Sequence, residues 1–210
     1  MRETLKDFIK GAGYILSYLF PYKLYFECKR LKKFLLSGYM KRQFKSVGPN
    51  FAVASPIYLT GGQYIKIGTN FETGPGLRIE AHDRFYNDRF QPEISIGNNV
   101  QFNYDCHVGC ISRVTIGDDV LIASKVMIID HSHGEVTAEA IKLPPAKRPL
   151  VTKGNVVIGN NVWIGEGAVI MPGVSIGDNC IVGGNAVVTK SFEPNCLIGG
   201  NPAKVIRHLV

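Results

Sequence analysis

The sequence predicts an all-β fold, a parallel β-helix of triangular cross-section, with a short α-helical N-terminal segment. Two observations carry this prediction: a six-residue period of aliphatic side chains, and a basic N-terminal stretch that lacks it. A period of six fits neither an α-helix nor a two-sided sheet. Three short strands, about one for every six residues, close one triangular coil of roughly 18 residues.

The period is clearest over residues 156–188. Every sixth residue is aliphatic, and a second series of aliphatic or small residues runs two positions ahead: Ile158, Ile164, Ile170, Ile176, Val182 and Val188 after Val156, Val162, Ala168, Val174, Cys180 and Ala186. Similar pairs recur from Ile65/Ile67 to Val126/Ile128, giving five coils, and residues 47–64 predict an irregular first coil. Glycine and asparagine, for which positive φ costs least, are expected at the corners: Gly159, Asn160, Gly165, Gly177 and Gly183.

Two segments interrupt the period and are predicted to be extruded loops. Residues 80–93 are polar and aromatic, and residues 129–155 contain three prolines that exclude regular strand pairing. Long ordered loops on a rigid scaffold are usually functional. The predicted organisation is therefore a helical segment over residues 1–46 and a β-helix domain over residues 47–210, with these two loops.

The N-terminal segment carries all of the net charge of +7. Residues 1–46 contain eleven Lys and Arg against three Asp and Glu, whereas the remainder contains thirteen against fourteen. Its apolar run over residues 14–22 is shorter than the ~20 residues a membrane span needs, and Pro21 is expected to end or kink a helix. The segment predicts helices lying on an anionic membrane surface, a helical cap on the first coil, or an oligomer contact. No recognition motif accompanies the charge, so nucleic acid is not an expected partner.

The five cysteines are scattered and form no CxxC pair. Cys106 and Cys180 fall on inward positions, where a thiol packs as a small hydrophobe, and this usage fits a reducing compartment. No cleavable signal sequence is apparent. The expected localisation is cytoplasmic, with peripheral contact at the inner membrane face as a further hypothesis.

Residues 156–207 resemble the C-terminal signature of the hexapeptide-repeat acyltransferases, and the detailed likeness spans about residues 94–207. The resemblance is to the maltose and galactoside O-acetyltransferase group and to related enzymes of capsule and colanic-acid synthesis. It implies a left-handed β-helix, a homotrimer, and acetyl-CoA as co-substrate in the groove between neighbouring prisms, with no metal expected. The period alone fixes neither the handedness nor the trimer.

Asp130, His131, Ser132 and His133 open the longer loop and form the candidate catalytic sequence. Acyl transfer from a thioester to an alcohol needs a base for the hydroxyl proton, and histidine titrates near neutrality. His131 aligns with the catalytic histidine of the family and is the preferred base. His133 shares its face in an extended strand and is the alternative. Asp130 starts on the opposite face, so it is not expected to orient the imidazole.

The acceptor side is less well defined. The resemblance places Asn103 beside the acceptor hydroxyl, although a corner asparagine in left-handed conformation is the competing interpretation. The carboxylate that contacts sugar in the galactoside enzymes would fall near Ile111 and is absent, so a simple galactoside is not the expected acceptor. The first loop supplies candidate sugar-reading residues: Glu80, His82, Asp83, Arg84 and Tyr86. His82 and His107 are otherwise interpreted as loop and corner residues rather than ligands.

The expected coenzyme groove begins at Trp163, which stands between two inward residues and therefore faces outward. Its family analogue lies beside the pantetheine arm; packing against the next subunit is the alternative. The resemblance adds glycines that leave room for that arm and residues that contact the nucleotide end: Gly165, Gly183, Gly184, Thr189, Lys190, Lys204 and Arg207. Cations suit the coenzyme phosphates, while a solvated tail is the alternative for the basic residues.

The predicted function is an acetyl-CoA-dependent O-acetyltransferase that acts on a sugar or polysaccharide precursor. His131 would deprotonate a hydroxyl that attacks the thioester directly in a ternary complex. Alternatives on the same fold are an N-acetyltransferase acting on an amino sugar, a xenobiotic or serine acetyltransferase, and a non-catalytic scaffold. A zinc hydrase of the γ-carbonic-anhydrase type is disfavoured because the chain has no His-x4-His spacing.

Overall fold

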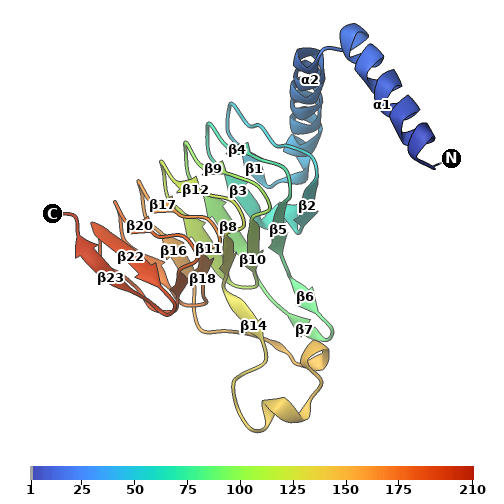
Figure 1. The fold of residues 1–210 in the computed structure, drawn as a ribbon. Helices are drawn as coiled ribbons and strands as arrows, with labels where there is room; N and C mark the ends of the chain where they lie inside the picture. Colours follow the sequence, from blue (N-terminus) through green and yellow to red (C-terminus); the bar gives the residue numbers. More distant parts are fainter. Residues whose placement is uncertain (1) are drawn as a thin grey trace.

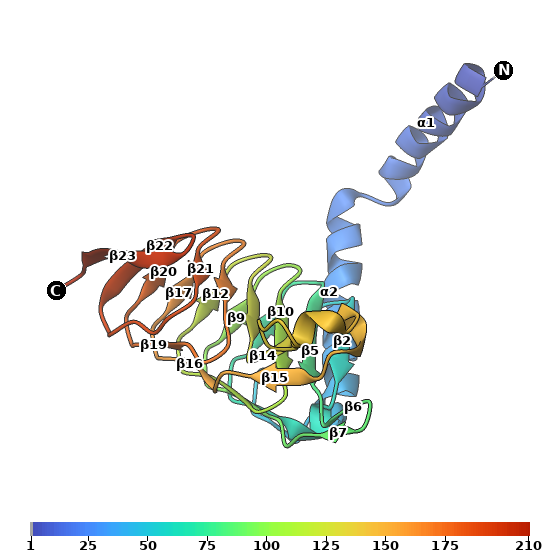
Figure 2. The ribbon, with the colours of Figure 1, turned by 90° about the horizontal axis from the view of Figure 1, so that it is seen from below.

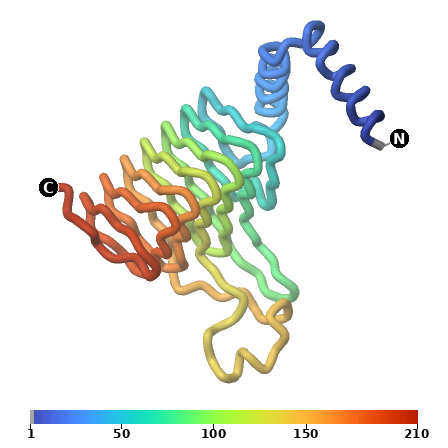
Figure 3. Tube along the Cα trace, viewed as in Figure 1, coloured from blue at the N-terminus to red at the C-terminus, as the bar shows by residue number. Residues whose placement is uncertain are grey.

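A computed structural model describes residues 2–210 as a stack of triangular coils with two helices at one end (Figures 1 and 3). In each coil the chain visits three parallel sheets in turn, which we name A, B and C. Sheet A contains β1 (Ser46–Val47), β3 (Ile65–Ile67), β8 (Glu93–Ile96), β11 (Arg113–Ile116), β16 (Val156–Ile158) and β19 (Ser175–Ile176).

Sheet B contains β4 (Glu72–Thr73), β9 (Gln101–Phe102), β12 (Leu121–Ile122), β17 (Trp163–Ile164), β20 (Ile181–Val182) and β22 (Cys196–Gly200), and it is extended by the antiparallel strand β23 (Ala203–His208). Sheet C contains β2 (Ile57–Thr60), β5 (Leu77–Ala81), β10 (His107–Cys110), β13 (Met127–Ile129), β18 (Val169–Ile170) and β21 (Val187–Val188).

The six-residue series fills the core. All twelve residues of the two series over residues 156–188 are at most 1 % exposed, so the predicted inward direction is confirmed. Burial of these aliphatic side chains supplies most of the driving force for folding. At the end that carries the helices the core changes to aromatic rings, and Phe44, Phe51, Phe71 and Phe102 contact one another in sequence at centroid distances of 5.6–5.9 Å.

The corner between sheets A and B is uniform. It repeatedly contains four residues, as in 97–100, 117–120 and 159–162. An asparagine or aspartate in this corner has φ between 54° and 62° in every coil. All seven of these side chains belong to ladders in which one amide donates to the next side chain: Asn50, Asn70, Asn99 and Asp119, then Asn161, Asn179 and Asn195.

The prediction of positive φ at Gly159, Asn160, Gly165, Gly177 and Gly183 is wrong: their φ angles are not positive. In the first of these corners the left-handed residue is Asn161. Close approach between coils explains most of the glycines instead. A Cβ on Gly165 would lie 2.6 Å from the backbone nitrogen of Gly184, closer than non-bonded atoms approach.

The two long loops both leave from the corner between sheets C and A. The first loop contains the hairpin β6 (Arg84–Phe85) and β7 (Asp88–Arg89). The second contains the antiparallel pair β14 (His131–His133) and β15 (Leu150–Thr152), joined through the 3₁₀ turns Ala140–Lys142 and Pro145–Lys147. Figure 1 shows both loops projecting from the same side of the stack.

The N-terminal helices are α1 (Arg2–Leu19) and α2 (Tyr22–Met40), and they meet at Pro21. Only the last turns of α2 pack on the coils. Ser37 and Met40 are the buried residues of α2, and the Ser37 hydroxyl accepts a hydrogen bond from the Val53 backbone N–H at 2.9 Å. Helix α1 extends away from the stack (Figure 2). Across residues 2–210, no helix is long and apolar enough to cross a membrane.

Candidate active site

Asp130 and His131 form a hydrogen-bonded pair where the chain leaves sheet C. The Nδ1 atom of His131 donates to Oδ1 of Asp130 at 2.9 Å. The Asp130 side chain is fully buried, while that of His131 is 13 % exposed. This pairing overturns the expectation that Asp130 faces away. The chain bends at Asp130 between β13 and β14, so the alternation of an extended strand does not continue through it.

The Asp130 carboxylate is held by the neighbouring coil. Backbone N–H groups of Ile111 and Ser112 donate to it at 2.9 and 2.8 Å, and the Cys110 thiol donates at 3.3 Å. Burial opposes ionisation of Asp130, but the hydrogen bonds from His131 and the two backbone groups outweigh it, so the pKa of this carboxyl lies below its ordinary value. An ionised carboxylate fixes the proton of His131 on Nδ1 and leaves Nε2 as an acceptor.

Three side chains from earlier coils stand beside His131. Arg78 and Glu80 lie on β5 and His107 lies on β10, where strand register places His107 opposite Arg78 and Gly109 opposite Glu80. Arg78 Nε and His107 Nε2 lie 2.9 and 3.2 Å from Oε2 of Glu80. We call Arg78, Glu80 and His107 the acceptor wall, because they line one cleft of about 310 Å³ with His131.

Two histidines of this cleft have a lowered pKa, which favours their neutral form. Burial lowers the pKa of His82, and burial together with the Arg78 charge lowers the pKa of His107, while Glu80 opposes both shifts. The interpretation of His107 as a corner residue is wrong, because His107 lies on strand β10. His82 does follow β5 in the loop, and its ring stands edge-on to that of His131 at 6.1 Å.

Gly109 leaves the space that the His131 ring occupies. A Cβ at Gly109 would lie 3.3 Å both from Cε1 of His131 and from Nε2 of His107. The absence of a side chain here lets the two imidazoles approach over the same strand. Neither Gly109 nor the Arg78 and His107 pair was singled out from the sequence, because their neighbourhood depends on register across an extruded loop.

The two loops contact each other next to the cleft. The ring of Phe85, from β6, packs edge-on against His133 at 5.4 Å. Of the polar residues in the first loop, Asp83 accepts a hydrogen bond from the Tyr64 hydroxyl at 2.8 Å and Arg84 donates to the Tyr86 carbonyl at 2.9 Å. The Asp83 and Arg84 side chains therefore stabilise the conformation of the loop, and Glu80 and His82 are left to line the cleft.

Asn103 lies at a different corner from His131. It follows β9 between sheets B and C, and lines a cleft of about 400 Å³ with Lys33 of α2 and with Glu72. Lys33 and Glu72 form an ion pair at 2.6 Å. The glycines Gly165, Gly183 and Gly184 follow β17 and β20 at this same corner. One chain therefore does not bring Asn103 and His131 together.

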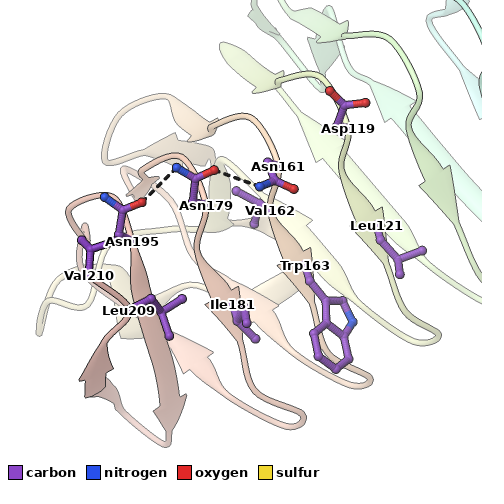
Figure 4. A pocket seen from close by; sticks show the side chains of 10 residues that line it. All are labelled: Asp119, Leu121, Asn161, Val162, Trp163, Asn179, Ile181, Asn195, Leu209 and Val210. Atoms are coloured by element: carbon purple, nitrogen blue, oxygen red, sulfur yellow. Dashed lines mark hydrogen bonds between the residues drawn. The ribbon is translucent and has the colours of Figure 1, made fainter.

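The remaining predicted coenzyme residues are spread over two faces. Trp163 is 51 % exposed on sheet B, above a hollow shared with Asp119, Asn161 and Ile181 (Figure 4). Lys204 and Arg207 lie on β23 of the same sheet. Thr189 and Lys190 follow β21 at the corner of His131, and Thr189 lines a cleft together with Ser132.

Comparison with known proteins identifies the family. The model of the bacterial transferase hexapeptide family (six repeats) matches residues 155–190. The chain is 41 % identical over 156 residues to WbbJ of Escherichia coli K12, named for O-acetyl transfer in lipopolysaccharide biosynthesis, covering 72 % of this chain and 76 % of WbbJ. It is 34 % identical over 170 residues to galactoside O-acetyltransferase of the same organism, covering 81 % and 66 % of the two chains.

A solved structure gives the same result. Galactoside acetyltransferase in complex with coenzyme A superposes with a TM-score of 0.58 at 34 % identity, over 82 % of this chain and 69 % of that one. A triangular β-helix that carries a histidine at its extruded loop is thus matched by acetyltransferases in both sequence and structure. The chain belongs to the hexapeptide-repeat transferase family, and the predictions of this family and of an acyltransferase are confirmed.

Proposed function

We propose that the protein transfers an acetyl group from acetyl-CoA to a hydroxyl of a sugar or polysaccharide precursor. The observation that carries this proposal is the His131–Asp130 pair, in which a buried carboxylate holds Nδ1–H and leaves Nε2 as a base. The relatives named for O-acetyl transfer support the choice of hydroxyl acceptor.

The reaction follows from this geometry. Nε2 of His131 accepts the proton of the acceptor hydroxyl as its oxygen attacks the thioester carbonyl carbon, and the Asp130 carboxylate stabilises the imidazolium. Collapse of the tetrahedral intermediate breaks the carbon–sulfur bond, and the imidazolium returns the proton to the leaving thiolate. No acyl-enzyme forms. His133 remains the alternative base, although its edge-on contact with Phe85 suits a positioning role.

The coenzyme groove is proposed to run along the corner between sheets B and C of one chain. Trp163 would flank the pantetheine arm, and Gly165, Gly183 and Gly184 would admit it. On sheet B of that chain, Lys204 and Arg207 would contact the phosphates. Thr189 and Lys190 lie at the corner of His131 and would reach the phosphates from the neighbouring copy. A positively charged, partly exposed set of this kind suits a phosphorylated nucleotide.

A complete site is proposed to require two copies of a left-handed prism. His131 and Asn103 occupy different corners of one chain, so Asn103 acts on the acceptor held by the His131 corner of a neighbour. The Asn103 corner of one prism then contacts the His131 corner of the next, in a head-to-tail arrangement that closes as a ring. We propose that three prisms form this ring, which makes the protein a homotrimer.

Complementation tests this arrangement. N103A and H131A should each lose activity, whereas trimers assembled from an equal mixture should regain active sites at about one quarter of the interfaces by random assortment. Separately assembled trimers, mixed without exchange, are the control. No recovery in mixed trimers would place both groups within one chain and refute the shared site.

The base itself is tested by H131A with H133A as the matched control. H131A should lower kcat at least about 100-fold, the usual size of general-base contributions, while acetyl-CoA still raises the melting temperature by mass action. Normal turnover by H131A together with loss by H133A would exchange the two assignments.

We also propose that the segment of residues 1–46, whose end packs on the first coil, rests on an anionic membrane and brings the domain of residues 47–210 to lipid-linked acceptors. Helix α1 exposes Phe8, Ile15 and Leu16 by half or more, and the excess of basic residues lies mainly in α2 and in residues 41–45. The replacements F8S and I15S together should abolish binding to phosphatidylglycerol vesicles in low salt, and Y58S on the prism is the control. Unchanged binding would contradict the proposal.

A further inference from the structure

The acceptor wall is the group of polar and charged side chains in the cleft that take no part in the proposed reaction. Arg78, Glu80 and His107 project from adjacent strands of sheet C on the same outer face as Gly109. Gly109 lies between this wall and His131, since the Cβ position at Gly109 is 3.3 Å from both imidazoles. A molecule whose hydroxyl reaches His131 therefore lies within hydrogen-bonding range of the wall.

The wall is already paired within itself. Glu80 lies 2.9 Å from Arg78 Nε and 3.2 Å from His107 Nε2, and Arg78 Nη2 lies 3.1 Å from His107 Nδ1. One negative and one positive charge therefore cancel. A carboxylate or phosphate on the acceptor would have to displace Glu80 from Arg78, leaving the half-buried Glu80 charge beside a second anion, which costs free energy.

A neutral polyol meets no such cost. Each sugar hydroxyl both donates and accepts, and the free lone pairs of a carboxylate accept from it. The cleft of about 310 Å³ lies at the small end of the range for small-molecule sites. We propose that Arg78, Glu80 and His107 bind the ring hydroxyls of the acceptor and select an uncharged sugar unit over a uronic acid. The proposal rests on the O-acetyltransferase function above.

The test compares acceptors and variants of the full chain. Initial rates of coenzyme A release would be measured with methyl hexosides and with the matching hexuronides. The wild type should use the neutral glycosides at least about tenfold better in kcat/KM. E80Q should raise the KM for neutral acceptors about 10- to 100-fold, the equivalent of one hydrogen bond to a charged group, and the KM for acetyl-CoA should stay within about twofold.

The matched control is E93Q. Glu93 lies on sheet A and forms comparable ion pairs with Lys66 at 2.8 Å and Arg113 at 3.4 Å, away from the cleft. E93Q should keep wild-type kinetics. R78Q provides a second variant of the wall in case E80Q does not fold, and it should raise the same KM.

The outcomes separate the two proposals. If sugars are acetylated and E80Q and R78Q both have the kinetics of E93Q, the proposed role of the acceptor wall is overturned and the O-acetyltransferase function stands. A preference of the wild type for hexuronides would have the same meaning. If no hydroxyl acceptor supports coenzyme A release by the wild type, the O-acetyltransferase function is overturned, and the proposed role of the acceptor wall with it. A raised acceptor KM in the wall variants, with that for acetyl-CoA unchanged, supports both.

Discussion

Asp130→Asn tests the buried carboxylate most directly, because the replacement keeps the shape and removes one acceptor. Oδ1 of Asp130 accepts from His131 Nδ1 and from the Ile111 N–H, and Oδ2 accepts from the Ser112 N–H and the Cys110 thiol. Asparagine offers one oxygen and one NH₂ group. Whichever way the amide is turned, a donor faces a donor.

The size of the effect follows from these contacts. With the NH₂ group toward Ser112, a buried N–H loses its acceptor at a cost of about 1–3 kcal/mol. With the NH₂ group toward His131, the ring takes the other tautomer and Nε2 carries a proton, so it no longer acts as a base. The same replacement in a serine-protease triad lowers kcat ~10⁴-fold. We expect kcat to fall about 10²- to 10⁴-fold, or roughly 3–5 kcal/mol of barrier.

The assay is coenzyme A release at saturating acetyl-CoA and acceptor, with the melting temperature measured on the same samples. The KM for acetyl-CoA should change little, since Asp130 is buried beneath His131. D118N is the matched control, because Asp118 also accepts a backbone N–H, that of Asn98 at 2.6 Å, but lies at the corner between sheets A and B. A folded D130N with kcat within about threefold of wild type would refute the orienting role.

Three further predictions concern the same surfaces. G109A should lower kcat about tenfold with the fold retained, because its Cβ displaces the His131 ring. A kcat equal to that of the wild type would show that the His131 ring can shift without loss of activity. Because the pKa of His82 and of His107 is lowered by burial, the unfolded chain binds protons first as pH falls below about 6.5. The melting temperature should therefore drop between pH 7 and 5, and H107Q should reduce that drop; an unchanged profile would contradict it. W163A should raise the KM for acetyl-CoA several-fold at constant kcat, whereas V157A on sheet A should not; equal effects would remove Trp163 from the groove.

The core could be predicted from the sequence because each inward position is dictated locally. A repeat of about six residues leaves one register in which Val156, Ile158 and their repeats face inward, and no long-range information is needed. The position of His131 was accessible for the same reason, since the period stops immediately before it. The expected corner glycines failed because the pattern marks a corner without distinguishing positive φ from close contact, and Asn161 rather than Asn160 takes the left-handed conformation.

Within the acceptor wall, Glu80 is a candidate sugar-reading residue from the sequence, but the pair of Arg78 and His107 could not be predicted because its register crosses an irregular segment. Arg78 pairs with His107, 29 positions later, since the hairpin of the first loop adds residues to an 18-residue coil. The contact of Asp130 with His131 depends on a bend in the chain at Asp130 that the sequence pattern does not predict. The sequence does not decide whether the N-terminal segment caps the first coil, because only the end of α2 packs there, through the buried residues Ser37 and Met40.

The unequal corners of the prism bear on how such an enzyme acquires a new acceptor. Four-residue turns and asparagine ladders make the corner between sheets A and B intolerant of insertion, because an added residue would break the left-handed turn and the side-chain hydrogen bonds that run through it. The corner between sheets C and A already takes segments as different as residues 111–112, 82–92 and 130–155 without disturbing the coils on either side. Specificity can therefore diversify through changes of loop length at the edge of the catalytic cleft, while the folding unit stays fixed.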